Sequence, residues 1–152
     1  RGADGHQCRN SNTTTTLSST DQPGHGDFIL INSHWRNPSS GNLWQGVNGI
    51  NNPCPSGYRL PTVAELAEER SSWSYSNSAG AFASTLKLPI AGGRDPLNGS
   101  LYGVGSIGNY WSSTISGNSS PFALGISSNY AIFNDAVFVI PSEGYSVRCI
   151  KD

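Results

Sequence analysis

The chain has 152 residues and a mass of 16.1 kDa, which suits one domain that buries about two-thirds of its unfolded surface. Charged residues make up only 12% and the net charge is -1, which argues against the basic surface that nucleic acids and anionic membranes require. Four tryptophans and 10% aromatic residues argue against disorder. No apolar run approaches the ~20 residues that cross a bilayer, so we expect no membrane insertion.

The first part of the chain is polar. Residues 1–27 are rich in Gly and Thr, with a threonine tract at 13–16, and are predicted to form an N-terminal arm or long surface loop. The apolar run at 28–31 predicts a short strand. Residues 43–47 fit either another short strand or a buried loop.

A capping box predicts where the main helix begins. The Thr62 hydroxyl can accept the backbone N–H of Glu65, while the Glu65 carboxylate accepts the N–H of Thr62. Apolar residues then recur at helical spacing, so we predict one amphipathic helix over about 62–73 that packs on a sheet. The polar segment 74–80 is predicted to end it, and we expect no other good helix.

The second half of the chain predicts strands. Pro89 limits the segment 86–93 to an edge or bulged strand. The further predicted strands are 108–114, a hairpin of 122–126 and 130–133 around the turn 127–129, then 136–140 and 145–150. In the last strand, Tyr145, Val147 and Cys149 share one face. Several short strands with one helix predict an α+β domain with small antiparallel sheets.

The aromatic residues fall into two groups. Tyr110 and Trp111 are neighbours in a predicted strand, so they face opposite sides and one of them is predicted to be in the core. Other aromatics stand beside Gly, Asn or Ser in loops, where they could stack on a sugar, anchor a partner or simply cover the core; these are Trp35, Trp44, Tyr75, Tyr102 and Tyr130.

Two patterns suggest cofactors. Residues 103–108 match G-x-G-x-x-G, but a strand pattern follows where a dinucleotide site needs a helix, so we interpret them as a glycine-rich loop. Asp95, Asn98, Asn134 and Asp135 could offer oxygens to Ca²⁺, although such loops are more often plain turns. We therefore expect no resident cofactor, with calcium as the one alternative, and no enzymatic activity.

Three cysteines are present: Cys8, Cys54 and Cys149. The chain has no Cys-x-x-Cys, and its histidines are scattered, so a disulfide is a better interpretation than a metal site. The three pairings stay open at this point. A disulfide favours an oxidising, extracellular setting.

Four separated motifs resemble one family. They are Asn-Pro-Cys-Pro-Ser-Gly-Tyr-Arg-Leu-Pro-Thr at 52–62, Leu-Pro-Ile-Ala-Gly-Gly-Arg at 88–94, Gly-x-Ile-Gly-Asn-Tyr-Trp-Ser-Ser-Thr at 105–114 and Gly-Tyr-Ser-Val-Arg-Cys-Ile at 144–150. Over about residues 24–152 the chain resembles the Fibrobacter succinogenes major paralogous (FISUMP) domain, a relative of the Legionella collagen-like adhesin C-terminal domain. The resemblance implies a C-type-lectin-like fold on a bacterial surface or secreted protein, without enzymatic activity.

The resemblance also implies a disulfide pairing. Cys54 and Cys149 lie in two of the motifs and Cys8 in none, so the implied bridge is Cys54–Cys149. Cys8 would then be free or would crosslink to another chain. Family members carry further sequence before the point where Arg1 stands, so we expect a processed or partial chain.

We therefore predict a non-catalytic extracellular or cell-surface module that binds a ligand or mediates adhesion, with a glycan or a surface protein of another cell as its partner. The expected contact surface is mainly the loops between Leu97 and Tyr130. The candidate ligand-binding residues are Trp44, Asn98, Tyr102, Asn118, Asn129 and Tyr130. The alternative is a structural subunit that assembles with its own copies into a fibre, tube or sheath. A lectin-fold enzyme of the formylglycine-generating type is a third reading, which would need neighbouring reactive cysteines.

Overall fold

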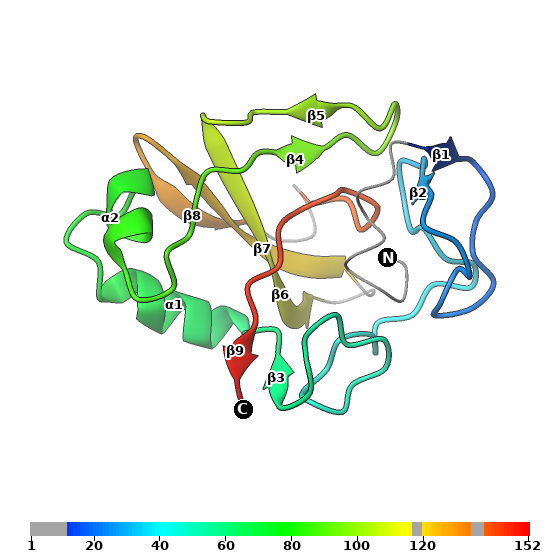
Figure 1. The fold of residues 1–152 in the computed structure, drawn as a ribbon, viewed down its shortest axis with the longest axis horizontal. Helices are drawn as coiled ribbons and strands as arrows, with labels where there is room; N and C mark the ends of the chain where they lie inside the picture. The colour runs from blue at the N-terminus through cyan, green and yellow to red at the C-terminus, as the bar shows by residue number, and fades with distance from the viewer. Residues whose placement is uncertain (1–11, 117–119, 135–138) are drawn as a thin grey trace.

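A three-stranded antiparallel sheet lies at the centre of the computed structural model, with two short helices to one side and long loops to the other (Figure 1). The structure describes residues 12–116, 120–134 and 139–152. Its elements are β1 (Thr13–Thr14), β2 (Phe28–Ile29), β3 (Tyr58–Arg59), α1 (Val63–Ser71), α2 (Ser78–Ala83), β4 (Gly93–Arg94), β5 (Leu101–Tyr102), β6 (Ile107–Ser116), β7 (Ser120–Ser127), β8 (Ala131–Asn134) and β9 (Ile150–Lys151). The predicted mixed α+β class with small antiparallel sheets is confirmed.

The central sheet has the strand order β6-β7-β8. Tyr110 pairs with Leu124 and Trp111 with Ala123, and the β6–β7 register shifts between Trp111 and Ile115. The predicted strand 108–114 and the hairpin around 127–129 are confirmed, because β6 spans the first and β7 and β8 form the second.

Both faces of this sheet are buried. Tyr110 and Trp111 are each 3% exposed and point to opposite faces, so the prediction that one of them is core is right but incomplete. The first face carries the cluster Leu66, Ala81, Leu88, Tyr110, Leu124, Ile126 and Ala131. The second carries Leu60, Trp111, Ala123 and Val139. We call these the helix-covered face and the loop-covered face.

On the helix-covered face, α1 begins as predicted. Thr62 is its N-cap and forms the full capping box with Glu65, and Leu66 is buried against the sheet. The Val63 N–H also donates to the Thr114 hydroxyl of β6 at 3.0 Å, which fixes this end of the helix on the sheet. The helix ends at Ser71, two residues before the predicted end at Trp73.

The prediction of a single helix is wrong, since α2 follows. Asn77 caps α2, because its side-chain oxygen accepts the N–H groups of Ala79 and Gly80. A Cβ on Gly80 would lie 1.9 Å from the Tyr75 carbonyl oxygen, so only glycine permits this close turn. The polar composition of 74–80 indicated a helix end, but it also supplies the cap of the next helix.

The loop-covered face is held by the Cys54–Cys149 disulfide, which confirms the implied pairing. Next to it, β3 pairs antiparallel with β9. The strand predicted at 145–150 is only partly formed, because Ser146 makes an isolated bridge to Tyr110 and regular pairing is confined to β9. Tyr145 and Val147 nevertheless pack on the second cluster, as the predicted alternation requires.

Three other segments predicted as strands are mostly irregular or lie largely outside the described residues. The segment 86–93 is irregular up to Ala91, because Pro89 removes a ladder donor. The edge or bulged strand predicted there is wrong except at its last two residues, since Gly92 makes an isolated bridge to Gly108 and Gly93 begins β4. Residues 43–47 form a loop closed by the Leu43–Ile50 bridge. Most of 136–140 lies outside the described residues, although Val139 is buried.

The described part of the N-terminal segment is mostly exposed loop, but it is attached to the domain. The short strand β1 pairs in parallel with β2, which lies within the strand predicted at 28–31. Ser18 is buried, and its N–H donates to the Trp35 carbonyl at 3.1 Å. Neither described helix is long and apolar enough to span a bilayer.

Candidate functional site

A hollow lies between the loop of residues 34–44, cyan in Figure 1, and the strands β6 and β7. Its cavity volume is about 60 Å³, room for a few water molecules, and the hollow is partly open to solvent. Its described lining consists of His34, Trp35, Arg36, Ser39, Ser40, Leu43, Trp44, Trp111, Ser112, Ile115, Pro121 and Pro141. We call it the tryptophan pocket, because three of the four tryptophans in the chain line it.

Each pocket tryptophan is held by a different part of the backbone. The Trp111 N–H donates to the Ser146 carbonyl at 3.0 Å, and its ring lies 4.6 Å from the Tyr145 ring, centre to centre. The Trp35 carbonyl accepts the N–H of Ser18, and the Trp44 N–H donates to the Ile50 carbonyl at 2.9 Å. The pocket therefore brings together three indole rings, one from β6 and two from loops, and each is held by a different segment of the chain.

Trp44 carries two unfavourable features. Its backbone has φ 64°, in the left-handed region that bulky residues rarely adopt. Its indole Nε1 is buried and has no hydrogen-bond partner among the residues that the structure describes. Each feature costs roughly 1–3 kcal/mol, and strain of this kind gathers at functional sites.

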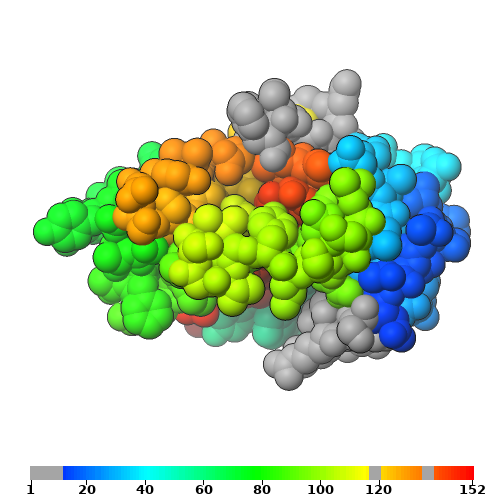
Figure 2. Space-filling model, turned by 90° about the horizontal axis from the view of Figure 1, so that it is seen from above, coloured from blue at the N-terminus to red at the C-terminus, as the bar shows by residue number. Residues whose placement is uncertain are grey.

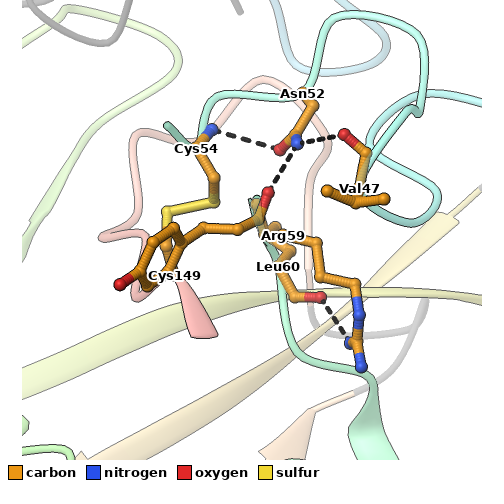
Figure 3. The surroundings of a disulfide bond; sticks show 7 residues. Val47, Asn52, Cys54, Arg59, Leu60 and Cys149 are labelled. Carbon is orange, nitrogen blue, oxygen red and sulfur yellow. Dashed lines mark hydrogen bonds between the residues drawn. A yellow bond between two sulfur atoms is a disulfide. The ribbon is translucent and has the colours of Figure 1, made fainter. Parts of the chain in front are cut away.

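The loop that carries Trp44 is fixed behind the pocket. Gln45 donates from its amide to the Ser113 carbonyl on β6. The Asn52 amide donates to the carbonyls of Val47 at 3.0 Å and Tyr58 at 2.9 Å, while its oxygen accepts the Cys54 N–H at 3.1 Å (Figure 3). Since Cys54 is bonded to Cys149, these contacts join the Trp44 loop to the disulfide and the C-terminal segment.

The charge in the tryptophan pocket is balanced. The Arg36 Nε lies 2.8 Å from an Asp21 carboxylate oxygen, close enough for an ion pair although the N–H is not aligned as a hydrogen bond. Arg36 also donates to the Pro38 carbonyl. No carboxylate is among the described lining residues, which are mainly aromatic, aliphatic and serine residues with His34 and the ion-paired Arg36.

The structure separates the predicted ligand residues. Trp44 lines the tryptophan pocket, which none of the other described candidates does. Asn98 and Tyr102 belong to the β4–β5 hairpin, while Asn129 and Tyr130 form the turn between β7 and β8. Figure 2 shows both segments, light green and orange, on the face that is turned to the viewer. Asn118 lies outside the described residues.

Part of this second group supports the fold. The Tyr102 hydroxyl donates to the Glu143 carboxylate at 3.4 Å, and burial followed by the Glu143 charge raises the pKa of Tyr102. The Asn98 side-chain oxygen accepts the N–H and hydroxyl of Ser100 at 2.8 and 2.6 Å. Tyr130, at 46% exposed, is the more accessible aromatic of this group.

Sequence reasoning missed Trp111 and the polar lining residues as site candidates. Trp35 was among the loop aromatics that could contact a ligand. No local sequence pattern, however, indicates that it lies near Trp44 or near a strand far along the chain. A tryptophan-rich composition is a signal for such a site, although it does not identify which rings meet.

The described residues do not form a recognisable metal site. In the described ranges, no group of three or more His, Cys, Asp or Glu side chains is arranged to hold an ion. The Asp95 carboxylate instead accepts the N–H groups of Leu97 at 2.7 Å and Asn98 at 3.1 Å, as in a plain turn. Asp135 lies outside the described residues, so the calcium alternative stays a prediction.

Comparison of the chain with models of protein families, with curated proteins and with solved structures gives no match. The resemblance to the FISUMP domain therefore rests on the four sequence motifs.

Proposed function

We propose that the chain is a non-catalytic recognition module of an extracellular or cell-surface protein and that the tryptophan pocket holds its ligand. The observation that carries this proposal is Trp44, which combines strained backbone and an unpartnered buried donor at the wall of the pocket. Strained backbone and unpaired buried donors are concentrated at functional sites, and this tendency supports the assignment of Trp44 to the site. The Cys54–Cys149 disulfide weakly favours an oxidising compartment.

The chemistry of the lining favours binding over catalysis. Neither a carboxylate nor a thiol belongs to its described part, and no hydrogen bond joins His34 to a lining serine in the described ranges. Nucleophilic catalysis needs such a positioned base beside the nucleophile. For the fold we propose the C-type-lectin-like class, on the four motifs together with the small antiparallel sheet, its flanking helices and the long loops.

The test is an array of glycans and surface proteins that is probed with the full chain and two variants. Trp44→Ala alters the tryptophan pocket, and Tyr102→Ala with Tyr130→Ala alters the loop surface predicted from the sequence. We expect binding that is lost in the first variant and kept in the second. The reverse pattern would transfer the site to the loops, and an array without any bound ligand would contradict the recognition function.

Self-assembly is the alternative, and the edge strand β8 bears on it. β8 has only four residues, and the outward carbonyl of Ala131 already accepts a hydrogen bond from Arg70 on α1 at 3.0 Å. Short, covered edges disfavour pairing with another copy. Light scattering over a dilution series distinguishes the two functions, because a fibre subunit would gain mass with concentration.

A further inference from the structure

We propose that the tryptophan pocket is an anchor site for one short aliphatic side chain, the size of valine or proline, presented by an extended segment of a partner protein. This inference rests on the proposed recognition function and names the kind of partner and the group that it inserts. It follows from the size of the hollow, the apolar groups that remain accessible in it and the charge of its lining.

The size of the hollow limits what can enter it. An apolar cavity of about 150 Å³ accepts benzene, which has six carbon atoms. In proportion, the 60 Å³ of the tryptophan pocket has room for about two or three carbon atoms. The side chains of valine and proline have this size, whereas an aromatic side chain or a whole small ligand is too large.

Apolar side chains form the accessible walls of the pocket. Its floor is closed, because Trp35 and Trp111 are buried. The half-buried apolar residues of the described lining are Leu43, Trp44, Ile115, Pro121 and Pro141. Ile115 pairs with Pro121 across β6 and β7, so these two form the strand side of the hollow. An aliphatic group that enters from solvent contacts these walls without displacing the two buried indoles.

Water in the hollow has few hydrogen-bond partners. The Ser112 hydroxyl donates to the Phe122 carbonyl at 3.0 Å, and the Trp44 Nε1 is closed to solvent. Ser39 is exposed, so its hydroxyl belongs to the mouth of the pocket and not to the floor. Weakly held water is displaced favourably by an apolar group, which favours an aliphatic occupant over a polar one.

The charge of the lining favours a neutral side chain. The Asp21 carboxylate lies 2.8 Å from the Arg36 Nε and balances the guanidinium charge. A charged side chain would have to break this ion pair or enter beside it at a partly buried position, and either costs desolvation. Valine and proline avoid this cost. An apolar pocket with a polar rim is also the arrangement in which protein interfaces hold their anchor residues.

The occupant has to be part of a larger partner, because three carbon atoms cannot hold a ligand by themselves. Each buried methylene contributes roughly fourfold to affinity, so three of them correspond to a dissociation constant of about 20 mM at best. The remaining affinity must come from contacts around the mouth, which a protein segment supplies. The pocket therefore selects one residue within a protein contact.

The experiment uses the tryptophans as reporters. The full chain, labelled with ¹⁵N, has four indole N–H signals, which Trp→Phe variants assign. It is titrated with the N-acetyl methylamides of glycine, alanine, valine, proline, leucine, phenylalanine, lysine and glutamate. Trp73 packs beside the helix-covered cluster and donates to Glu69 at 3.3 Å, so it is the internal control.

We expect the valine or the proline derivative to move the Trp44 signal saturably, with a dissociation constant of about 20–200 mM, and to leave the Trp73 signal in place. The glycine, lysine and glutamate derivatives should bind at least about tenfold more weakly. The proposal is overturned if no aliphatic derivative moves a pocket indole, or if the glycine or the charged derivatives move it equally. In that case, array binding that still depends on Trp44 would leave the recognition function standing with another ligand class.

A change in the size of the pocket gives a second test. Ile115→Ala shortens the strand-side wall, so the affinity for the leucine derivative relative to the valine derivative should rise about fourfold, the effect of one further buried carbon. Ile132→Ala is the matched control, because Ile132 is a 45% exposed aliphatic residue of the same sheet outside the lining. An unchanged preference in folded Ile115→Ala, or the same change in both variants, would contradict the anchor site.

Discussion

The two faces of the central sheet are built differently. The helix-covered face joins Tyr110 and Leu124 to two capped helices, and its cluster consists of side chains at regular spacing. The loop-covered face joins Trp111 to segments that make mostly isolated bridges, and a disulfide holds it together. The unfavourable features at Trp44 occur on this second face.

We infer that the two faces serve different purposes. Regular packing with satisfied caps stabilises one face, and covalent closure together with a few side-chain hydrogen bonds holds the other in an irregular shape. Irregular backbone can place three rings from distant segments around one hollow, which a helix or a strand alone cannot do. The account predicts that changes on the first face affect stability, while selected changes on the second affect binding.

The largest expected effect is the loss of the disulfide. Replacing Cys54 and Cys149 together by serine, with Cys8 also replaced to prevent mispairing, removes a closure of 95 residues. We expect the free energy of unfolding to fall by about 2–5 kcal/mol in urea denaturation, largely because the unfolded chain gains freedom. A chain that carries Cys8→Ser alone is the matched control. Equal stability of the two variants would contradict the role of the bridge.

On the helix-covered face, Leu124→Ala should leave a cavity. Leu124 is fully buried at the centre of the first cluster, and such truncations cost about 2–5 kcal/mol. Urea denaturation measures this loss. The affinity per folded molecule should stay the same as in the wild type, since no lining residue changes. An affinity loss as large as that of Trp44→Ala would contradict the division between the faces.

A smaller effect on stability is expected from Glu65, which lies where β3, α1 and the C-terminal segment meet. Two hydrogen bonds from Arg59, at 2.8 and 2.7 Å, are the main cause that lowers the pKa of Glu65 from 4.5 to about 2, with Thr62 adding and burial opposing. Since the folded pKa is the lower one, the stabilisation is complete above pH 4.5 and is lost as the pH falls toward 2.

Because the Glu65 side chain is 36% exposed, solvent screening reduces this contribution to about 1–2 kcal/mol. Glu65→Gln should therefore lower the free energy of unfolding at pH 7 and make it less dependent on pH between 4.5 and 2. Urea denaturation of both chains across this range measures the difference. Glu68→Gln, an exposed neighbour on the same helix, is the control, and an equal effect there would contradict the assignment.

The sequence predicted the helix-covered face better than the loop-covered face. The start of α1 follows from Thr62 and Glu65, since a capping box is a local pattern with a local cause. The hairpin of β7 and β8 is likewise set by alternation around a short turn. α2 was missed because its Asn77 cap and its close turn at Gly80 resemble an ordinary helix end.

The tryptophan pocket could not be predicted in this way. Trp35 and Trp111 line the same hollow only because the chain returns across the sheet, and no spacing in the sequence encodes that return. The positive φ of Trp44 is also hidden, because a tryptophan is not a residue that a sequence pattern would place in the left-handed region. The disulfide pairing was predicted only from the resemblance of the motifs to a family, because the cysteine positions alone left all three pairings open.

The most direct test of the account is Trp44→Phe, which keeps an aromatic ring and removes the unpartnered N–H. The free energy of unfolding should stay within about 0.5 kcal/mol of the wild type or rise by about 1 kcal/mol, because a buried donor without a partner is lost. The deciding measurement is the affinity of this variant for the ligand found on the array, at equal folded concentration. The account predicts a three- to tenfold weaker affinity. Unchanged affinity together with a clear loss of stability would show that Trp44 serves only the fold.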